Sequence, residues 1–333
     1  MSVSYAAVGW NRAKKAYDAT IASGLVVYLA LFCGVGFAAH PNATIETLLI
    51  RALATASFLM LHVILSIGPL CRLSPRFLPL LYNRRHLGVT LFLVALAHAV
   101  FAIVQFHALG NVNPLVSLLT SGTGFQTFGA AALCILFFMA ATSHDFWLAT
   151  LSPRAWKTLH MGVYFAYALI VLHVALGALH AESHPVLAIA TGAGMAWLLT
   201  LHVFAAFHER AGDRDAARLN DGWIDAGPVS DIQDGRARVV CAEERIAVFR
   251  YEGKISAVSN VCRHQNGPLG EGRVIDGCIT CPWHGYQYLP GNGRSPAPFT
   301  EKVPTFDVRV VDGRVYVNPE AHEPGTPVQP AHV

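Results

Sequence analysis

The chain has 333 residues, a formal net charge of +3 and only 14% charged residues. Its mean hydropathy of +0.42 is too high for an ordinary soluble protein, in which about a quarter of the residues are charged. The seven cysteines are an odd number and lack disulfide-like spacing over most of the chain, which argues against a disulfide-stabilised scaffold.

Six apolar segments in the first two-thirds of the chain are long enough to cross a membrane. Each holds about 20 or more mostly apolar residues, which at ~1.5 Å per helical residue spans the ~30 Å hydrocarbon layer. Strands of a membrane barrel would be about half this length and would alternate in polarity, so an all-α six-helix transmembrane bundle is expected. The predicted spans are 20–39, 47–68, 86–107, 125–148, 156–180 and 186–207.

Positive residues are confined to alternate connections of this bundle. The loops after spans one, three and five contain no Lys or Arg, although Arg51 lies close to the first of them. Positively charged loops stay in the cytoplasm, so both chain ends are predicted to be cytoplasmic in a multi-pass protein of a bacterial inner membrane. The other connections carry Arg12, Lys14, Lys15, Arg72, Arg76, Arg84, Arg85, Arg154, Lys157, Arg210, Arg214 and Arg218.

Histidines are frequent inside these spans, where a polar ring needs a partner. Spans three and five both start on the cytoplasmic side, and each carries two histidines that lie twelve or thirteen residues apart. At ~1.5 Å per residue the two histidines of one span are about 18–20 Å apart, so the two spans match in depth. Matched pairs suit one or two b-type haems, each held by two imidazoles. The outer pair is His98 and His173, and the inner pair is His160 and His86, with His62 and His202 as rival inner ligands.

The motifs "SIGPLCRL", "NRRHLGVTLFLVALAHAVFA", "ATSHDFW" and "WKTLHMGVYFAYALIVLHV" follow one another across spans two to five. In this order they resemble the ferric reductase-like transmembrane domain, and are similar to the haem-binding membrane subunit of the bacterial methionine sulfoxide reductase system. The resemblance implies haem ligands at His98, His160 and His173, whereas the position of His86 is not usually a histidine in that subunit. Arg84 and Arg85 are interpreted either as partners of haem propionates or as determinants of topology alone.

The pattern changes after the last span. Residues 209–221 are polar and are expected to form a linker, while "RARVVCAEERIAVFRYEGKISAVSNVC" alternates with a turn at "EGK". The Asp-Gly in "VPTFDVRVVDGRVYVNP" is a strong hairpin signal. The domains are therefore predicted as a cytoplasmic N-terminal segment at 1–19, the six-helix haem domain at 20–208, a small all-β domain at 222–320 and a tail at 321–333.

Two Cys–His pairs of the β domain have the spacing of a metal centre. The fragments "CRH" and "CPWH" supply two thiolates and two imidazoles from two loops. This donor set suits either zinc or a Rieske [2Fe–2S] cluster, in which two His replace two Cys on one iron. Zinc sites more often use C-x2-C or H-x3–5-H spacings. The candidate ligands are Cys262, His264, Cys281 and His284.

Glycines follow each pair in "NGPLGEG" and "HGYQY", and the later loop "GNGRSPAPF" is rich in proline. With these features the segment resembles the Rieske fold, which implies that the two cysteines hold one iron and the two histidines the other. Gly267 and Trp283 stand where the Rieske proteins of respiratory quinol enzymes carry an extra disulfide, so the segment is more similar to the Rieske ferredoxins that serve oxygenases. Tyr288 stands where the quinol-oxidising group places a hydroxyl against a cysteine sulfur, and is interpreted as a cluster hydrogen-bond donor or as a core residue.

Neither part of the chain shows a sequence motif for a nucleotide-binding site or for a catalytic iron site. There is no G-x-G-x-x-G before a helix, no P-loop, and no mononuclear iron site after the Rieske-like segment. We therefore expect a membrane-bound electron-transfer oxidoreductase, supplied by a separate NAD(P)H-dependent flavoprotein reductase or a ferredoxin. Electrons would pass between the cluster and the b-type haem or haems, and leave to a quinone, a ferric chelate or a periplasmic protein. The alternatives are a redox sensor, an anchoring subunit of a larger complex, or quinol oxidation with reversed flow; membrane lipid is an expected partner and nucleic acid is not.

Overall fold

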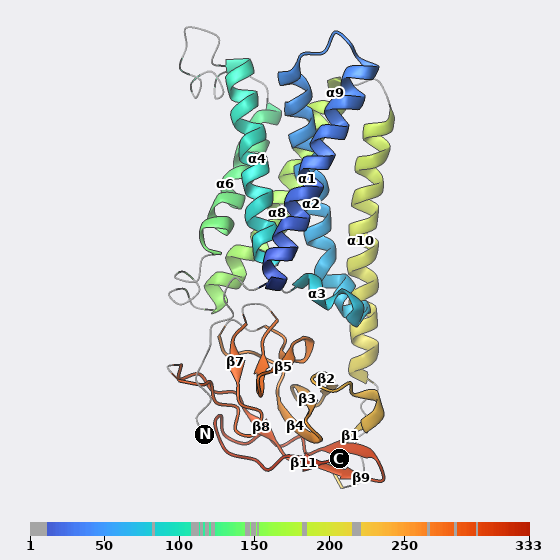
Figure 1. The fold of residues 1–333 in the computed structure, drawn as a ribbon, viewed down its shortest axis with the longest axis vertical. Helices are drawn as coiled ribbons and strands as arrows, with labels where there is room; N and C mark the ends of the chain where they lie inside the picture. The colour runs from blue at the N-terminus through green and yellow to red at the C-terminus, as the bar shows by residue number, and fades with distance from the viewer. Residues whose placement is uncertain are drawn as a thin grey trace. The chain divides into compact units, whose positions relative to one another are not determined.

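The computed structural model describes residues 12–81, 84–107, 113, 116, 120, 124–143, 147, 151, 153–181, 185–214, 221–264, 267–282, 285–297 and 299–333. The chain divides into two compact units. Within the described residues, 12–68 and 84–202 form one unit, and 69–81 together with the part from 203 onward form the other. Figure 1 shows long helices in the first and a β-rich domain in the second.

Long apolar helices make up the N-terminal part of the chain. They are α1 (Arg12–Ala39), α2 (Ile45–Leu73), α4 (Arg84–His107), α6 (Gly124–Ala141), α8 (Pro153–Leu176) and α10 (Pro185–Arg214). Short helical pieces lie between them: η1 (Pro75–Phe77), α3 (Leu78–Leu81) and α9 (Ala178–Ala181). Among the described residues, six helices are long and apolar enough to cross a membrane, which confirms the predicted bundle.

A cap at the start of one helix and the apolar faces of five helices follow from their sequence. The Thr44 hydroxyl accepts the Thr47 N–H at 3.3 Å and caps the start of α2, as a threonine before a helix commonly does. One face of each of five helices packs into a shared core. Large apolar side chains also stay exposed on the outside, such as Leu199 with 69% of its surface, which suits contact with lipid rather than water. The core consists of Leu61, Leu65, Leu91, Ala132, Leu136, Ala166, Leu169 and Leu198.

The C-terminal domain is all-β, and its strands pair antiparallel throughout. One sheet has the order β1-β10-β9, a second has β11-β4-β3-β2 with β8 beside β4, and a third has β5-β6-β7. The strands are β1 (Ile224–Pro228), β2 (Ala237–Cys241), β3 (Arg245–Tyr251), β4 (Lys254–Ser259), β5 (Arg273–Ile275), β6 (Cys278–Thr280), β7 (Gln287–Tyr288), β8 (Thr305–Phe306), β9 (Val308–Val311), β10 (Arg314–Val317) and β11 (Ala331–His332). Two 3-10 turns, η2 (Val229–Asp231) and η3 (Leu269–Glu271), lie between them.

Three of the hairpins turn on two residues that end in glycine. Glu252-Gly253, Asp276-Gly277 and Asp312-Gly313 all have positive φ at both positions, from 48° to 77°. Such turns match the right-handed twist of the strands, and glycine adopts the second position without steric cost. The turns predicted at "EGK" and at Asp-Gly in the last hairpin are confirmed, and the Asp276-Gly277 turn fixes β6 against β5 just before Cys281.

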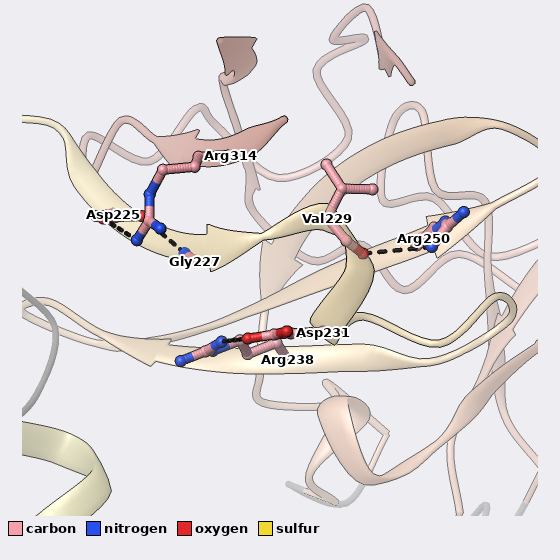
Figure 2. Close-up of polar contacts among 7 residues, drawn as sticks. All are labelled: Asp225, Gly227, Val229, Asp231, Arg238, Arg250 and Arg314. Carbon is pink, nitrogen blue, oxygen red and sulfur yellow. Dashed lines mark hydrogen bonds and ion pairs between the residues drawn. The ribbon is translucent and has the colours of Figure 1, made fainter. Parts of the chain in front are cut away.

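A β-bulge in β1 is held by a carboxylate. Asp225 accepts the Gly227 N–H at 2.8 Å and the Arg314 guanidinium at 2.6 Å, across the register shift between β1 and β10. Figure 2 shows both contacts, with the Arg238–Asp231 ion pair at 3.2 Å nearby. The paired charges tie the first strand to the last hairpin of the domain.

The ends of the β domain differ in detail from the predicted segments. Helix α10 continues to Arg214, within the segment expected as a linker, and residues 215–220 lie outside the described part. The segment set apart as a tail ends in β11, where Ala331 pairs with Ile255 of β4. Backbone hydrogen bonds make this segment part of the sheet. A strand of two residues is too short for its side chains to show an alternating pattern in the sequence.

Candidate functional site

The two predicted cysteine ligands each open a tight loop of the β domain. Cys262 comes after β4 and Cys281 directly after β6, and both side chains are buried, with 1% and 2% exposed. The Cys262 N–H donates to the Gly267 carbonyl at 2.9 Å, and the Cys281 N–H donates to the Tyr286 carbonyl at 2.7 Å. Each loop is thus closed five residues after its cysteine by the same hydrogen bond.

His264 lies in the first of these loops and is held by an aromatic neighbour. Its ring stacks on Tyr286 with 4.5 Å between centroids and 7° between planes. The Tyr286 hydroxyl donates to the Glu301 carboxylate, which also accepts the Thr300 N–H at 3.1 Å. Phe299, the last residue of the proline-rich loop, packs edge-on against Tyr286 at 5.1 Å. The end of this loop therefore packs against the tyrosine that stacks on His264.

A second buried tyrosine contacts a cysteine sulfur. The Tyr288 hydroxyl lies 3.4 Å from Cys262 Sγ, and it accepts the Arg263 N–H at 3.0 Å. Burial, and then the charge of Cys262, raise the pKa of Tyr288 far above its usual value. The hydroxyl therefore keeps its proton at physiological pH and can donate it to the sulfur.

The predicted donor set is the one that a two-iron cluster uses. A Rieske cluster divides its ligands, two thiolates on one iron and two imidazoles on the other. Among the described residues, no three His, Cys, Asp or Glu side chains are grouped so that they could hold one metal ion. The fourth predicted ligand, His284, and the neighbouring Trp283 lie outside the described residues. Cys278, which is buried in β6, keeps a neutral thiol because burial raises its pKa.

In the bundle, the predicted outer pair of histidines is brought together. The rings of His98 on α4 and His173 on α8 lie close together in an edge-on arrangement, with centroids 6.3 Å apart and planes at 75°. A ligating imidazole nitrogen lies about 2 Å from its metal, so two rings that hold one metal between them have centroids on the order of 6 Å apart. The observed spacing suits two imidazoles that would hold one metal.

The other nitrogen of each ring is anchored on a neighbouring helix. His98 Nδ1 is 3.1 Å from the Ile50 carbonyl of α2, and His173 Nδ1 is 2.7 Å from the Phe125 carbonyl of α6. A carbonyl only accepts, so each Nδ1 carries the proton and each Nε2 has its lone pair available, as in metal-binding histidines generally. Within the described part of the chain, neither Nε2 makes a hydrogen bond. A Cβ on Gly129 would lie 2.8 Å from His173 Nδ1, so glycine is needed beside this ring.

His160 has the same tautomer but a different setting. Its Nδ1 donates to the Trp156 carbonyl one turn earlier at 3.0 Å, and its ring stacks on the Trp156 indole at 3.7 Å. His160 Nε2 is buried without a hydrogen-bond partner, an arrangement that costs about 1–3 kcal/mol unless a ligand uses the lone pair.

The remaining candidate histidines differ in which ring nitrogen is engaged. His86 Nδ1 donates to the Asp18 carboxylate of α1 at 2.8 Å, which leaves the Nε2 lone pair of His86 available. His62 Nε2 accepts the Tyr167 hydroxyl at 3.1 Å. In the same way, His202 Nε2 accepts the Tyr164 hydroxyl of α8 at 3.2 Å. In both rivals Nδ1 already donates to a carbonyl one turn earlier, so the lone pair is taken up by an interhelical hydrogen bond.

Of the two arginines at the start of α4, Arg85 donates to the Ser143 carbonyl after α6 at 3.1 Å. Sequence reasoning missed Trp156, Gly129 and Asp18; only the Trp156–His160 spacing of four, one helical turn, was a signal that the sequence offered.

Comparisons with known proteins divide the chain in the same way. The family model of the Rieske [2Fe-2S] domain matches residues 222–307, and that of the ferric reductase like transmembrane component matches residues 51–171. The anthranilate 1,2-dioxygenase ferredoxin subunit of Burkholderia cepacia is 37% identical over 98 residues, which are 29% of this chain and 91% of that protein. A 3-phenylpropionate/cinnamic acid dioxygenase ferredoxin subunit of Photorhabdus laumondii is 34% identical over 91 residues, 27% of this chain and 87% of that protein.

A larger relative matches over a segment of similar length. A cholesterol 7-desaturase of Ciona intestinalis is 34% identical over 101 residues, which are 29% of this chain but only 21% of the desaturase. The chain belongs to the Rieske [2Fe–2S] family and joins that domain to a ferric reductase-like transmembrane component, which makes it a multi-pass membrane protein of redox electron transfer.

Proposed function

We propose that this protein is a membrane-bound oxidoreductase that transfers electrons between a cytoplasmic Rieske cluster and b-type haem in the bundle. The observation that carries the proposal is the opposed pair His98 and His173, whose ring spacing and tautomers suit axial ligation of one iron. When bound, a [2Fe–2S] cluster and a haem each accept and release single electrons without making or breaking covalent bonds.

The β domain would hold the cluster through the two closed loops. Cys262 and Cys281 would bind one iron, and His264 and His284 the other. Tyr288 would donate a hydrogen bond to the Cys262 sulfur, because its hydroxyl lies 3.4 Å away and keeps its proton. The burial of both cysteines limits access of water to the thiolates.

The bundle would hold haem with residues of α4 and α8. His98 and His173 would be the axial ligands of the outer haem, each fixed by a carbonyl of α2 or α6. His160 would be a ligand of an inner haem, because its Nε2 is buried and carries an available lone pair. Arg84 and Arg85 would be candidates for partners of haem propionates, since a guanidinium binds a carboxylate in a charge-assisted hydrogen bond.

The proposed orientation in the membrane follows from the positions of the positive residues, and the proposed partners follow from that orientation. Positive residues on alternate connections favour cytoplasmic termini in a bacterial inner membrane, with the six-helix domain at 20–208 and the Rieske domain at 222–320. A cytoplasmic cluster would take electrons from an NAD(P)H-dependent flavoprotein reductase or a ferredoxin. The acceptor on the far side would be a quinone, a ferric chelate or a periplasmic protein.

The test is the cofactor content and reducibility of the purified full chain in detergent. We expect two non-haem irons per chain, a low-spin bis-histidine haem spectrum, and rapid haem reduction once the cluster has been reduced anaerobically. His98→Ala should remove the low-spin haem, whereas the matched variant His62→Ala, whose Nε2 is bound to Tyr167, should keep it. A haem that stays oxidised beside a reduced cluster would refute electron transfer within the chain and favour a sensor.

A further inference from the structure

We propose that Glu301 is a positioning residue for the candidate cluster ligand His264, and that it acts through the ring of Tyr286. The inference rests on the proposed function, because it concerns the cluster of the same β domain. It gives a role in the site to a carboxylate that is not itself a candidate ligand.

The first argument is that Tyr286 connects three segments of the β domain. Its carbonyl accepts the Cys281 N–H at 2.7 Å and closes the second cysteine loop. Its ring stacks on His264 of the first loop, with 4.5 Å between centroids and 7° between planes. Its hydroxyl donates to the Glu301 carboxylate of a third segment. The ring is buried and is held at its backbone and at its hydroxyl, so it fixes the plane of the His264 ring.

The second argument is that Glu301 is held in place independently of the tyrosine. Its backbone carbonyl accepts the Ser295 N–H at 2.9 Å, which closes the end of the proline-rich loop. Its carboxylate also accepts the Thr300 N–H at 3.1 Å, which orients the side chain. A hydrogen bond to an ionised acceptor is about twice as strong as one between neutral groups, so the carboxylate holds the Tyr286 hydroxyl more firmly than a neutral acceptor would.

The third argument is that an imidazole plane needs such support. The χ2 torsion of histidine is broad and has no sharp intrinsic minimum, so neighbours decide the orientation of the ring. A parallel ring in contact restricts this torsion, because rotation would drive the edge of the imidazole into the neighbour. Groups that orient a ligating histidine also tune the metal centre that it binds. Glu301 would therefore affect the electronic state of the cluster without touching it.

The two tyrosines of this site have different tasks. The Tyr288 hydroxyl contacts Cys262 Sγ and the Arg263 N–H, whereas the Tyr286 hydroxyl contacts a carboxylate. Tyr286 also belongs to the apolar core of the domain, so its ring could serve packing alone. Removing only its hydroxyl separates the two roles, because phenylalanine keeps the packing.

The experiment is electron paramagnetic resonance of the dithionite-reduced full chain in detergent, with pulsed detection of the nitrogen couplings of the histidine ligands. Tyr286→Phe and Glu301→Ala should shift the g-values and one nitrogen coupling in the same way, and the double variant should add no further shift. Glu301→Gln should restore the wild-type spectrum, because its amide oxygen still accepts the hydroxyl. The matched control is Glu244→Ala, which removes a carboxylate that accepts the Ser259 hydroxyl at 2.7 Å and should leave the spectrum unchanged. Two non-haem irons per chain in each variant would show that the cluster is bound.

Two results would overturn the inference. A wild-type spectrum in Tyr286→Phe would mean that the ring acts by packing alone, and this variant decides the question even if Glu301→Ala loses the cluster. Equal shifts in Glu301→Gln and Glu301→Ala would mean that the charge of Glu301, rather than its hydrogen bond, acts on the cluster. Neither result touches the proposed function, which fails separately if the wild-type chain lacks the cluster or the haem, or passes no electrons between them.

Discussion

Replacing Tyr288 by phenylalanine removes one hydroxyl next to the predicted cluster and nothing else. The ring is fully buried, so the aromatic packing of the site should be kept. The hydroxyl accepts the Arg263 N–H at 3.0 Å, which orients its own hydrogen toward Cys262 Sγ at 3.4 Å. A metal-bound cysteine is a thiolate, so this hydrogen bond is donated to sulfur.

The expected size follows from the charge on that sulfur. Hydrogen bonds to neutral groups contribute about 0.5–1.5 kcal/mol and those to charged groups about 1.5–3 kcal/mol, and reduction adds negative charge to the cluster. If the bond strengthens by roughly 1–1.5 kcal/mol on reduction, its loss lowers the midpoint potential by about 40–65 mV, since a tenfold change in the equilibrium constant is 59 mV for one electron. Tyr288→Phe should therefore be harder to reduce than the wild-type chain.

The assay is an equilibrium redox titration of the detergent-purified chain, followed by the electron paramagnetic resonance signal of the reduced cluster. Tyr251→Phe is the matched control, because Tyr251 is also buried in the same apolar cluster but donates to or accepts from Ser256 at 2.9 Å. That variant should keep the wild-type potential. A Tyr288→Phe potential equal to or above that of wild type would refute the assigned hydrogen bond.

Two further changes probe other parts of the chain. Gly129→Ala would place a Cβ 2.8 Å from His173 Nδ1, and this overpacking, which costs about 1–3 kcal/mol, should lower the haem content measured by the pyridine haemochrome. Gly194→Ala crowds an α2 histidine instead and should keep the haem content. Equal haem content in both variants would contradict the ligand assignment. Burial raises the pKa of Asp225, but the hydrogen bonds from Arg314 and Gly227 outweigh burial and hold this pKa below its ordinary value. The ionised carboxylate therefore stabilises the folded domain above about pH 4, and this stabilisation is lost as the pH falls through the pKa of Asp225 in the folded state. Asp225→Asn should therefore flatten the acid side of the stability profile of the β domain in scanning calorimetry, and an unchanged acid slope would count against the ion pair.

The folds of both parts could be predicted because their signals are local. Runs of apolar residues with few charges specify membrane helices whatever their neighbours are, and Gly-containing two-residue turns specify hairpins. The Cys–His pairs at Cys262 and Cys281 were predicted from their spacing together with the resemblance to the Rieske fold, and the structure closes the short loop after each cysteine on its own backbone.

The choice among the bundle histidines could not be predicted in the same way. Depth along a helix follows from residue number, and on depth alone His86 was the predicted inner partner of His160, with His62 and His202 as rivals. The structure distinguishes them by their neighbours: Asp18 engages the first, and tyrosines of α8 engage the other two. These contacts join residues 68, 105 and 38 positions apart, which no local pattern records.

By itself, the sequence determined that six apolar helices precede a small β domain, and that two Cys–His loops of that domain have the form of an iron–sulfur site. Only the tertiary structure decided which imidazoles face each other and which nitrogen of each ring is available. The physical reason is that helix length and turn type depend on residues close in the chain, whereas the tautomer and direction of a buried ring depend on the carbonyl or hydroxyl that another helix presents to it.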